Sequence, residues 1–386
     1  MNHKFYYAIA QSDDIYPENA ANEIVEICLS QLNGKIPKAG IIYMGINIDH
    51  QKVLNIIHHR INGIDLIGCT TDGEFSSEKG YMQDSVLLIL FSSTEIDFIS
   101  GKIDLTGYNV ENVKTEIDTM ISKIDKQPRI GFLFSDGITL NSENSLEIMN
   151  NVFDGKIPFF GGAAADQWLF TGTKQFFGKT VLASSAVYLI LCGDFEYSFA
   201  LGTGWNAIGH YGVINKSERN IVKQIDGIRA IDFYQDLLGE GAIPSIEMPM
   251  AIYNKEDSFM YLRTTLQNNV GKDGSITFLG NIPEGYKVRL TLVDRNSILD
   301  SVTSAVEKAR KLFPPGKKPS IAICFSCTAR RALLGLRTDE EYKIVQAKLG
   351  GKIPVFGFYT YGEFSPPEDS SKTIFHNESF VCLLLE

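Results

Sequence analysis

Side chains that could bind a polar ligand are concentrated in three similar loops, each directly after an apolar run of strand length. The loops span 68–75, 161–168 and 357–364, and the first and third end in Gly-Glu-Phe. Carboxylates accept hydrogen bonds from amines and hydroxyls, and an arginine can bind a carboxylate or phosphate through two parallel bonds. The candidate ligand-binding residues lie in these loops or after a neighbouring apolar run: Thr71, Glu74, Asp166, Cys327, Arg330, Thr360, Tyr361 and Glu363.

The region around the third loop carries the fullest set of such groups. Arg330 and Glu363 follow neighbouring apolar runs, so both are expected beyond the carboxyl ends of parallel strands, where ligands gather. We predict that Arg330 binds an anionic group and that Glu363 and Asp166 accept from a cationic or hydroxyl group. Three further residues would line the site: Thr360, Tyr361 and Cys327. This combination suits an amino acid, although Arg330 and Glu363 could equally form a structural ion pair with each other.

The known catalytic and nucleotide-binding motifs are missing from the sequence. Neither G-x-S-x-G, H-E-x-x-H nor a zinc-deaminase pattern occurs, and no P-loop or dinucleotide fingerprint precedes a helix. Cys327 is near two arginines and could act as a thiolate nucleophile, but no base is evident beside it. We therefore expect a ligand-binding protein rather than an enzyme, with catalysis through Cys327 as an alternative.

Two histidines suggest a different chemistry. His376 enters the last apolar run and His210 lies near the middle of the chain, and either could bind haem iron or hydrogen-bond a ligand. The C-x-x-C-H motif is missing, so covalently attached haem is excluded by pattern. Haem b is thus the alternative cofactor, and otherwise no cofactor or metal is expected.

Composition narrows the class of protein. The formal charge of −10 over 386 residues argues against a nucleic-acid surface, which needs a cationic face. The longest apolar runs have strand length and are far shorter than the roughly 18–20 residues of a membrane span. The start of the chain has no signal-peptide core. Six cysteines, mostly inside apolar runs, are too few for a disulfide scaffold, so we expect reduced thiols and a cytoplasmic protein.

The loops belong to a longer recurring order of elements. Helix, strand, helix, strand, strand occurs three times, which indicates a repeated supersecondary unit. Short helical crossovers imply parallel strand pairs, and the strands after each loop imply mixed sheets. The predicted fold is α/β, with mixed β-sheets layered with helices and built from three related helix-strand-helix-strand-strand modules.

A different region separates the second cycle from the third. Residues 215–294 hold one helix and short strands with Gly, Asn and Asp turns, so we place a boundary near 215 and divide the chain into halves at 1–215 and 216–386. In the third cycle, Thr338 and Glu341 are predicted to form a capping box at the start of a helix.

The C-terminal half resembles the FIST C domain. The resemblance depends on motifs in a fixed order: Asp226-Gly227, Tyr261-Leu-Arg263, Asp273-Gly274-Ser275, Ile282-Pro283-x-Gly285, Phe325-Ser-Cys327-x-x-Arg330, Gly357-Phe-Tyr-Thr-x-Gly362-Glu363 and His376-Asn377. The N-terminal half is similar to the FIST N domain through Gly68-Cys-Thr-Thr-x-Gly73-Glu74 and Gly161-Gly-Ala-Ala-x-Asp166. Two departures are the segment 206–210, which lacks the usual proline, and the extra Cys324.

The resemblance implies an intracellular sensory module that binds a small ligand, proposed to be amino-acid-like. Some members of the family are haem-binding nitric-oxide sensors, and this is the first alternative function. The family also implies an output through signalling proteins. Because the sequence shows no attached output domain, we expect signalling in trans to a separate partner such as a histidine kinase, diguanylate cyclase or chemoreceptor.

Overall fold

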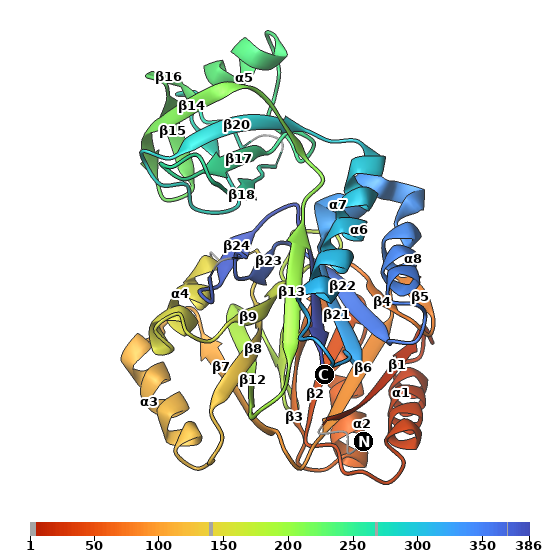
Figure 1. Ribbon diagram of the computed structural model, residues 1–386. Coiled ribbons are helices and arrows are strands. Elements are labelled where there is room, and N and C mark those ends of the chain that lie inside the picture. Colours follow the sequence, from red (N-terminus) through yellow and green to blue (C-terminus); the bar gives the residue numbers. More distant parts are fainter. Residues whose placement is uncertain (1–4, 139–141, 267–268, 369) are drawn as a thin grey trace.

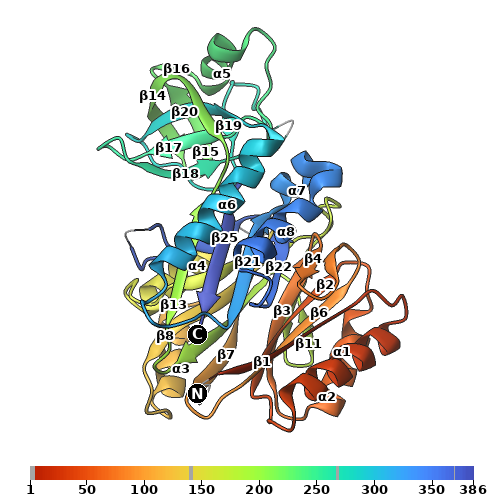
Figure 2. The ribbon, with the colours of Figure 1, turned by 45° about the vertical axis from the view of Figure 1, so that its right-hand side comes forward.

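A computed structural model describes residues 5–138, 142–266, 269–368 and 370–386. Three six-stranded sheets surround a common apolar core, helices cover their outer faces, and a smaller antiparallel domain stands at one end of the molecule (Figures 1 and 2). The predicted mixed α/β fold is confirmed. Within the described ranges, every helix is too short or too polar to cross a membrane.

The three sheets share one strand order. In each sheet, the first strand is antiparallel to the second, and the second is antiparallel to the third. The third and fourth strands are parallel, and a two-stranded hairpin pairs antiparallel with the fourth to complete the sheet. The first sheet contains β1 (Tyr6–Ser12), β6 (Val86–Ser92), β2 (Ala39–Gly45), β3 (Asp65–Thr71), β10 (Gln175–Phe177) and β11 (Thr180–Leu182). The second contains β7 (Asp97–Asp104), β12 (Ser185–Cys192), β8 (Pro128–Ser135), β9 (Phe159–Ala163), β23 (Glu363–Ser365) and β24 (Ile374–His376). The third contains β13 (Tyr197–Gly202), β25 (Phe380–Leu385), β21 (Ile321–Cys327), β22 (Val355–Thr360), β4 (Glu74–Ser76) and β5 (Gly80–Met82).

Each hairpin pairs with a sheet other than that of the strand it follows. The β4–β5 hairpin follows β3 but pairs with β22, β10–β11 follows β9 but pairs with β3, and β23–β24 follows β22 but pairs with β9. Each of the three sheets thus gives a hairpin to one of the other two and receives a hairpin from the remaining one. As a result, the halves 1–215 and 216–386 are interleaved. Descent of the three modules from one duplicated unit stays a prediction.

The first glycine of each repeated loop lies where two backbones approach closely. A Cβ on Gly68 would meet the carbonyl oxygen of Ile42 at 1.9 Å, and one on Gly357 would meet that of Cys324 at 2.1 Å. In the second sheet, Gly161 faces the carbonyl of Leu133 at 2.1 Å in the same way. The recurring glycine is therefore explained by packing of parallel strands.

The central strands form the core because both of their faces are covered, which is why they read as continuous apolar runs. One side chain from each sheet meets at the centre: the ring of Tyr43 lies 5.4 Å from that of Phe134 and 4.3 Å from that of Phe358, and the two phenylalanine rings are 5.8 Å apart. Such aromatic contacts add to the stabilisation that burial alone gives.

Amphipathic helices cover the outer face of each sheet. The first sheet packs against α1 (Pro17–Leu32) and α2 (His50–Arg60), and the second against α3 (Val110–Ile121) and α4 (Glu143–Val152). The third packs against α6 (Arg295–Leu312) and α8 (Asp339–Lys348), while α7 (Thr328–Leu334) and the short 3₁₀ helix η1 (Gly335–Arg337) lie directly after β21. In α1, Pro17 begins the helix, and Ile24, Cys28 and Leu32 form its buried face as their spacing predicts.

The smaller domain is inserted between β13 and α6. It consists of antiparallel strands and one helix with a separate apolar core, and it projects away from the three sheets (Figure 1). Its elements are β14 (Asn206–Glu218), β15 (Ile221–Ile225), β16 (Ile228–Arg229), α5 (Ala230–Leu238), β17 (Met250–Tyr253), β18 (Phe259–Arg263), β19 (Ile276–Thr277) and β20 (Lys287–Leu292). The boundary placed at 215 falls inside β14, because the insertion begins directly after β13.

The predicted capping box at the start of α8 is wrong. The Thr338 hydroxyl donates to the carbonyl oxygen of Gly335 at 2.7 Å, and the side chain forms no cap for α8. Glu341 turns inward and is completely buried, where it accepts from the Arg330 guanidinium. Glu341 therefore does not cap α8, because the buried Arg330 guanidinium needs a carboxylate as its partner.

Candidate ligand-binding site

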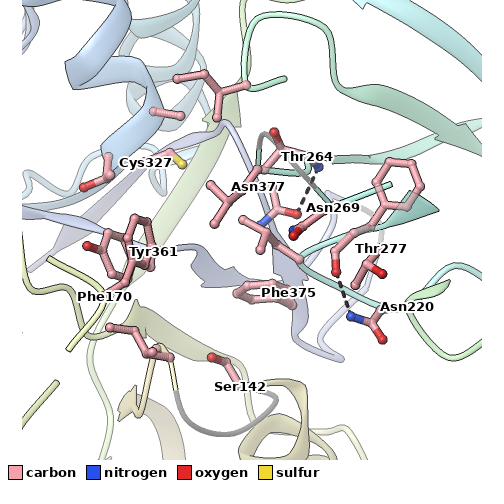
Figure 3. A pocket seen from close by; sticks show the side chains of 18 of the residues that line it. Ser142, Phe170, Asn220, Thr264, Asn269, Thr277, Cys327, Tyr361, Phe375 and Asn377 are labelled. Carbon is pink, nitrogen blue, oxygen red and sulfur yellow. Dashed lines mark hydrogen bonds between the residues drawn. The ribbon is translucent and has the colours of Figure 1, made fainter. Parts of the chain in front are cut away.

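A cavity of about 370 Å³ lies between the inserted domain and the carboxyl ends of the parallel strands. That volume is typical of a small-molecule site. The three-sheet body contributes Gly137, Ile138, Ser142, Trp168, Phe170, Cys327, Thr328, Ala329, Tyr361, Phe375 and Asn377. The inserted domain contributes Arg219, Asn220, Ile246, Thr264, Leu266, Asn269, Thr277, Phe278 and Leu279. Figure 3 shows Phe170 and Tyr361 on one side of the cavity and Asn220 and Thr277 on the other.

Aromatic rings form one end of the cavity. The rings of Phe170 and Tyr361 are stacked, with centroids 5.6 Å apart and planes at 16°, and Trp168 meets Tyr361 edge-on at 6.2 Å. Trp168 and Phe170 lie in a tight loop and have positive φ angles of 65° and 51°. This end offers a flat apolar surface to a ligand.

Asp166 holds that aromatic loop in place. It is fully buried and accepts from the Tyr361 hydroxyl at 2.7 Å and from the backbone N–H groups of Phe170, Thr171 and Gly172 at 2.8–3.1 Å. The carboxylate is therefore committed to the protein. The structure places Asp166 behind the site, as the residue that positions the aromatic rings, and it does not line the cavity.

The inserted domain supplies polar lining residues on the opposite side, beside the apolar Ile246, Leu266, Phe278 and Leu279. Arg219 is the one charged residue among the described residues that line the cavity. Next to it in the chain, the Asn220 amide donates to the carbonyl oxygen of Phe278 at 2.7 Å. A cation among amide and hydroxyl groups suits a carboxylate.

Cys327 forms part of the wall where β21 passes into α7. Its thiol is buried, and burial raises the pKa well above the ordinary value, with the charges of Glu363 and Glu378 raising it further. The side chain is thus a neutral thiol at neutral pH, and the pKa of a reactive cysteine is usually shifted in the opposite direction.

Arg330 does not line the cavity. Its guanidinium is fully buried and pairs with Glu341, from Nε at 2.9 Å and from Nη2 at 2.8 Å, so the predicted partner Glu363 is replaced by a residue of α8. It also donates to the carbonyl oxygens of Thr203 at 2.5 Å and Ile298 at 3.1 Å. Arg330 therefore joins the two segments that connect the inserted domain to the three-sheet body.

The remaining predicted residues divide between wall and interior. Tyr361 lines the cavity, as does Cys327, whereas Thr360 lies beneath the surface and donates to the carbonyl oxygen of Ala163 at 2.5 Å. Glu74 lies in the β4–β5 hairpin of the third sheet, where Thr71 and Ser85 donate to its two carboxyl oxygens. Burial raises the pKa of Glu74 to about 8, but the residue is not part of the cavity wall.

Neither histidine considered for haem lines the cavity. His376 is buried in β24, and its Nε2 lies 3.1 Å from the carbonyl oxygen of Ser365; burial lowers its pKa to about 4. His210 is exposed on β14 with its ring against Phe233. These surroundings do not fit an axial ligand pointing into a haem pocket.

Comparison with known proteins supports the resemblance to the FIST N and FIST C domains that the ordered sequence motifs indicated. The FIST N domain model matches residues 38–228, and the FIST C domain model matches residues 230–366. The chain belongs to the FIST family. FIST domains are sensory ligand-binding domains, and the two FIST models meet at residue 229, inside the inserted domain rather than at 215.

One curated relative is an uncharacterized protein of Methanocaldococcus jannaschii, 26% identical over 198 residues. The match takes in 50% of this FIST protein but only 38% of the relative. Two solved structures align over almost the whole chain. They are a chorismatase, with 8% identity and 98% of each chain covered, and a cyanuric acid hydrolase from A. caulinodans, with 6% identity and 98% and 99% covered. Both TM-scores are 0.36, too low to support an argument about function.

Several residues that line the cavity were not predicted as ligand-binding residues from the sequence. Arg219, Asn220 and Thr264 lie in the inserted domain, whose strands show no repeated loop, and nothing local marks them as neighbours of Tyr361. Glu378 does not line the cavity but lies behind its wall, two residues before β25 (Phe380–Leu385), and is buried.

Proposed function

We propose that this FIST protein is a sensor whose amino-acid-like ligand binds in the cavity between the inserted domain and the three-sheet body. The observation that carries the proposal is the lining: one end holds Trp168, Phe170 and Tyr361, and the other holds Arg219 among amides and hydroxyls. A ligand with an apolar body and a carboxylate matches both ends.

The carboxylate would bind to Arg219, the only charged group among the described lining residues. A charge-assisted hydrogen bond in a partly enclosed cavity is stronger than a neutral one. The apolar part would lie against the stacked rings of Phe170 and Tyr361. This favours amino acids with aromatic or long apolar side chains over small polar ones.

Signalling would follow from the position of the cavity. A ligand that contacts both bodies stabilises the orientation of the inserted domain in which both sets of contacts are made. Arg330 links Cys327–Ala329 in the cavity wall to the connecting segments through Thr203 and Ile298. We propose that a separate signalling protein, such as a histidine kinase, diguanylate cyclase or chemoreceptor, reads this orientation.

Isothermal titration calorimetry with the twenty amino acids tests the proposal. We expect at least one to bind, and Arg219→Ala to weaken binding by roughly 10- to 100-fold, the usual worth of a hydrogen bond to a charged group. Arg229→Ala is the matched control, because Arg229 is an exposed arginine of the same domain that pairs with Asp232 away from the cavity. No binding by any amino acid, or equal losses in both variants, would contradict the proposal.

A further inference from the structure

Two buried acids behind the cavity wall have carboxyl oxygens without hydrogen-bond partners among the described residues. Glu363 and Glu378 are both fully buried. The Oε2 atom of Glu363 accepts from the backbone N–H and hydroxyl of Ser379, at 3.0 and 2.7 Å, but its Oε1 has no partner in the described part of the chain. Neither oxygen of Glu378 has one. Buried acceptors are destabilising unless a donor satisfies them.

These acids lie directly behind residues that face the cavity. Glu378 follows Asn377, which lines the cavity, and the thiol of Cys327 in the same wall experiences the charges of both acids. Thr264 is a third wall residue, and its buried hydroxyl also has no partner among the residues that the structure describes. Thr264 lowers the pKa of Glu378 without reaching hydrogen-bond geometry. The unpartnered oxygens are thus grouped on one side of the cavity.

The backbone of Glu378 is also unusual. Its φ angle is 59°, in the left-handed region that glutamate rarely adopts. The next residue, Ser379, is nevertheless tightly fixed, since its N–H and its hydroxyl both donate to Glu363. Strained residues held by well-ordered neighbours are concentrated at functional sites, and this geometry at Glu378 favours a role for its carboxylate in binding.

We propose that Glu378, supported by Glu363, is the subsite for the ammonium group of the ligand. The inference rests on the proposed function and deepens it. An ammonium group supplies the proton donors that the unpartnered oxygens need and the positive charge that a buried carboxylate needs. The lining offers no other partner, because the described lining residues include no acid. The Thr264–Asn377 hydrogen bond, at 3.4 Å, is the weak contact that must open.

Binding by this route releases a proton. Burial raises the pKa of Glu378 to about 8, and the groups facing it are Glu363, the Cys327 thiol and, with opposite effect, Arg330. Glu378 is therefore largely protonated at neutral pH, and an ammonium group favours its ionised form. Its proton leaves to solvent, so affinity rises as pH rises, by up to about tenfold per pH unit below pH 8.

The test compares phenylalanine with 3-phenylpropionate, which has the same carboxylate and ring but no amine. Calorimetry in phosphate and Tris buffers at pH 7 measures both affinity and proton release. With the unmodified protein we expect phenylalanine to bind roughly 10- to 100-fold more tightly and to release close to one proton. With Glu378→Gln, the preference and the proton release both disappear.

Glu74→Gln is the matched control, because Glu74 is equally buried and its pKa is also raised to about 8, but Thr71 and Ser85 satisfy its carboxylate and it does not line the cavity. It should leave both readouts unchanged. If Glu378→Gln does not fold, Glu363→Gln gives the same comparison. The ammonium subsite is overturned if phenylalanine and 3-phenylpropionate bind with equal affinity. It is also overturned if Glu378→Gln and Glu363→Gln both still release a full proton. Either result leaves the proposed ligand cavity standing. If no amino acid binds to the unmodified protein, the proposed function fails and this inference fails with it.

Discussion

Glu341 accepts two hydrogen bonds from the Arg330 guanidinium, and both side chains are completely removed from solvent. Two further carboxylate contacts, from the Ser326 hydroxyl at 2.9 Å and the Tyr359 hydroxyl at 2.7 Å, hold the other oxygen of Glu341. The pair thus fastens α8 to the third sheet, while the free edge of the guanidinium holds the connectors of the inserted domain.

Replacing Arg330 with methionine should destabilise the protein by about 3–5 kcal/mol, because the carboxylate of Glu341 is left buried without its cation. Urea denaturation followed by circular dichroism measures the change. Arg337→Met is the control, since the Arg337–Glu340 pair is exposed and such pairs contribute at most about 1 kcal/mol. A loss in Arg330→Met no larger than in the control would show that the buried pair adds nothing.

Stability should fall as pH rises from about 5 to 8, in part because of Glu74. Burial raises the pKa of folded Glu74 from its ordinary value of 4.5 to about 8, so the folded state binds the proton more tightly than the unfolded state. The slope for one such group is at most about 1.4 kcal/mol per pH unit. Glu74→Gln should flatten the pH dependence of the free energy of unfolding, and an unchanged slope would contradict the shift.

Gly357→Ala should destabilise the third sheet, because its Cβ would lie 2.1 Å from the carbonyl oxygen of Cys324. Backbone cannot move aside as a flexible side chain can, so we expect a loss of about 3 kcal/mol. Gly107→Ala is the comparison, since no atom lies within 4 Å of its added Cβ. Thermal unfolding of the two variants measures the difference, and similar melting temperatures would refute the close approach.

Arg263 should control how firmly the inserted domain sits over the cavity. It pairs with Glu143 of α4 at 2.8 Å and donates to the carbonyl oxygen of Phe375 at 2.9 Å, both across the junction. Arg263→Met should increase amide hydrogen exchange in β18 and weaken ligand binding severalfold, because the cavity then needs ordering before it binds. Arg289→Met should have neither effect, because half-buried Arg289 lies over the ring of Tyr211 and donates to Gly209, both within the inserted domain. Unchanged exchange in β18 would contradict the role of Arg263.

The fold followed from the sequence where local patterns decide it. Apolar runs such as 321–327 are typical of buried strands, and the spacing of Ile24, Cys28 and Leu32 is typical of the buried face of a helix. The close backbone approach at the recurrent glycines appeared only in the structure. Ordered motifs indicated the FIST family. The exchange of hairpins among the sheets was not predictable, because β4 carries no signal that it pairs with β22 rather than with its own neighbours.

The ligand-binding site was predictable only in part, because its residues too are brought together by long-range pairing that leaves no local signal. The sequence by itself determined that Tyr361 and Cys327 follow strands whose ends face a common edge, since chain direction and strand order fix that. Only the tertiary structure decided which charges they meet. Arg330 is within reach of Glu341 and is drawn into the interior, whereas Arg219 and Thr264 reach the cavity because the inserted domain folds back over the strand ends. Long-range packing chooses these partners, and no local spacing encodes it.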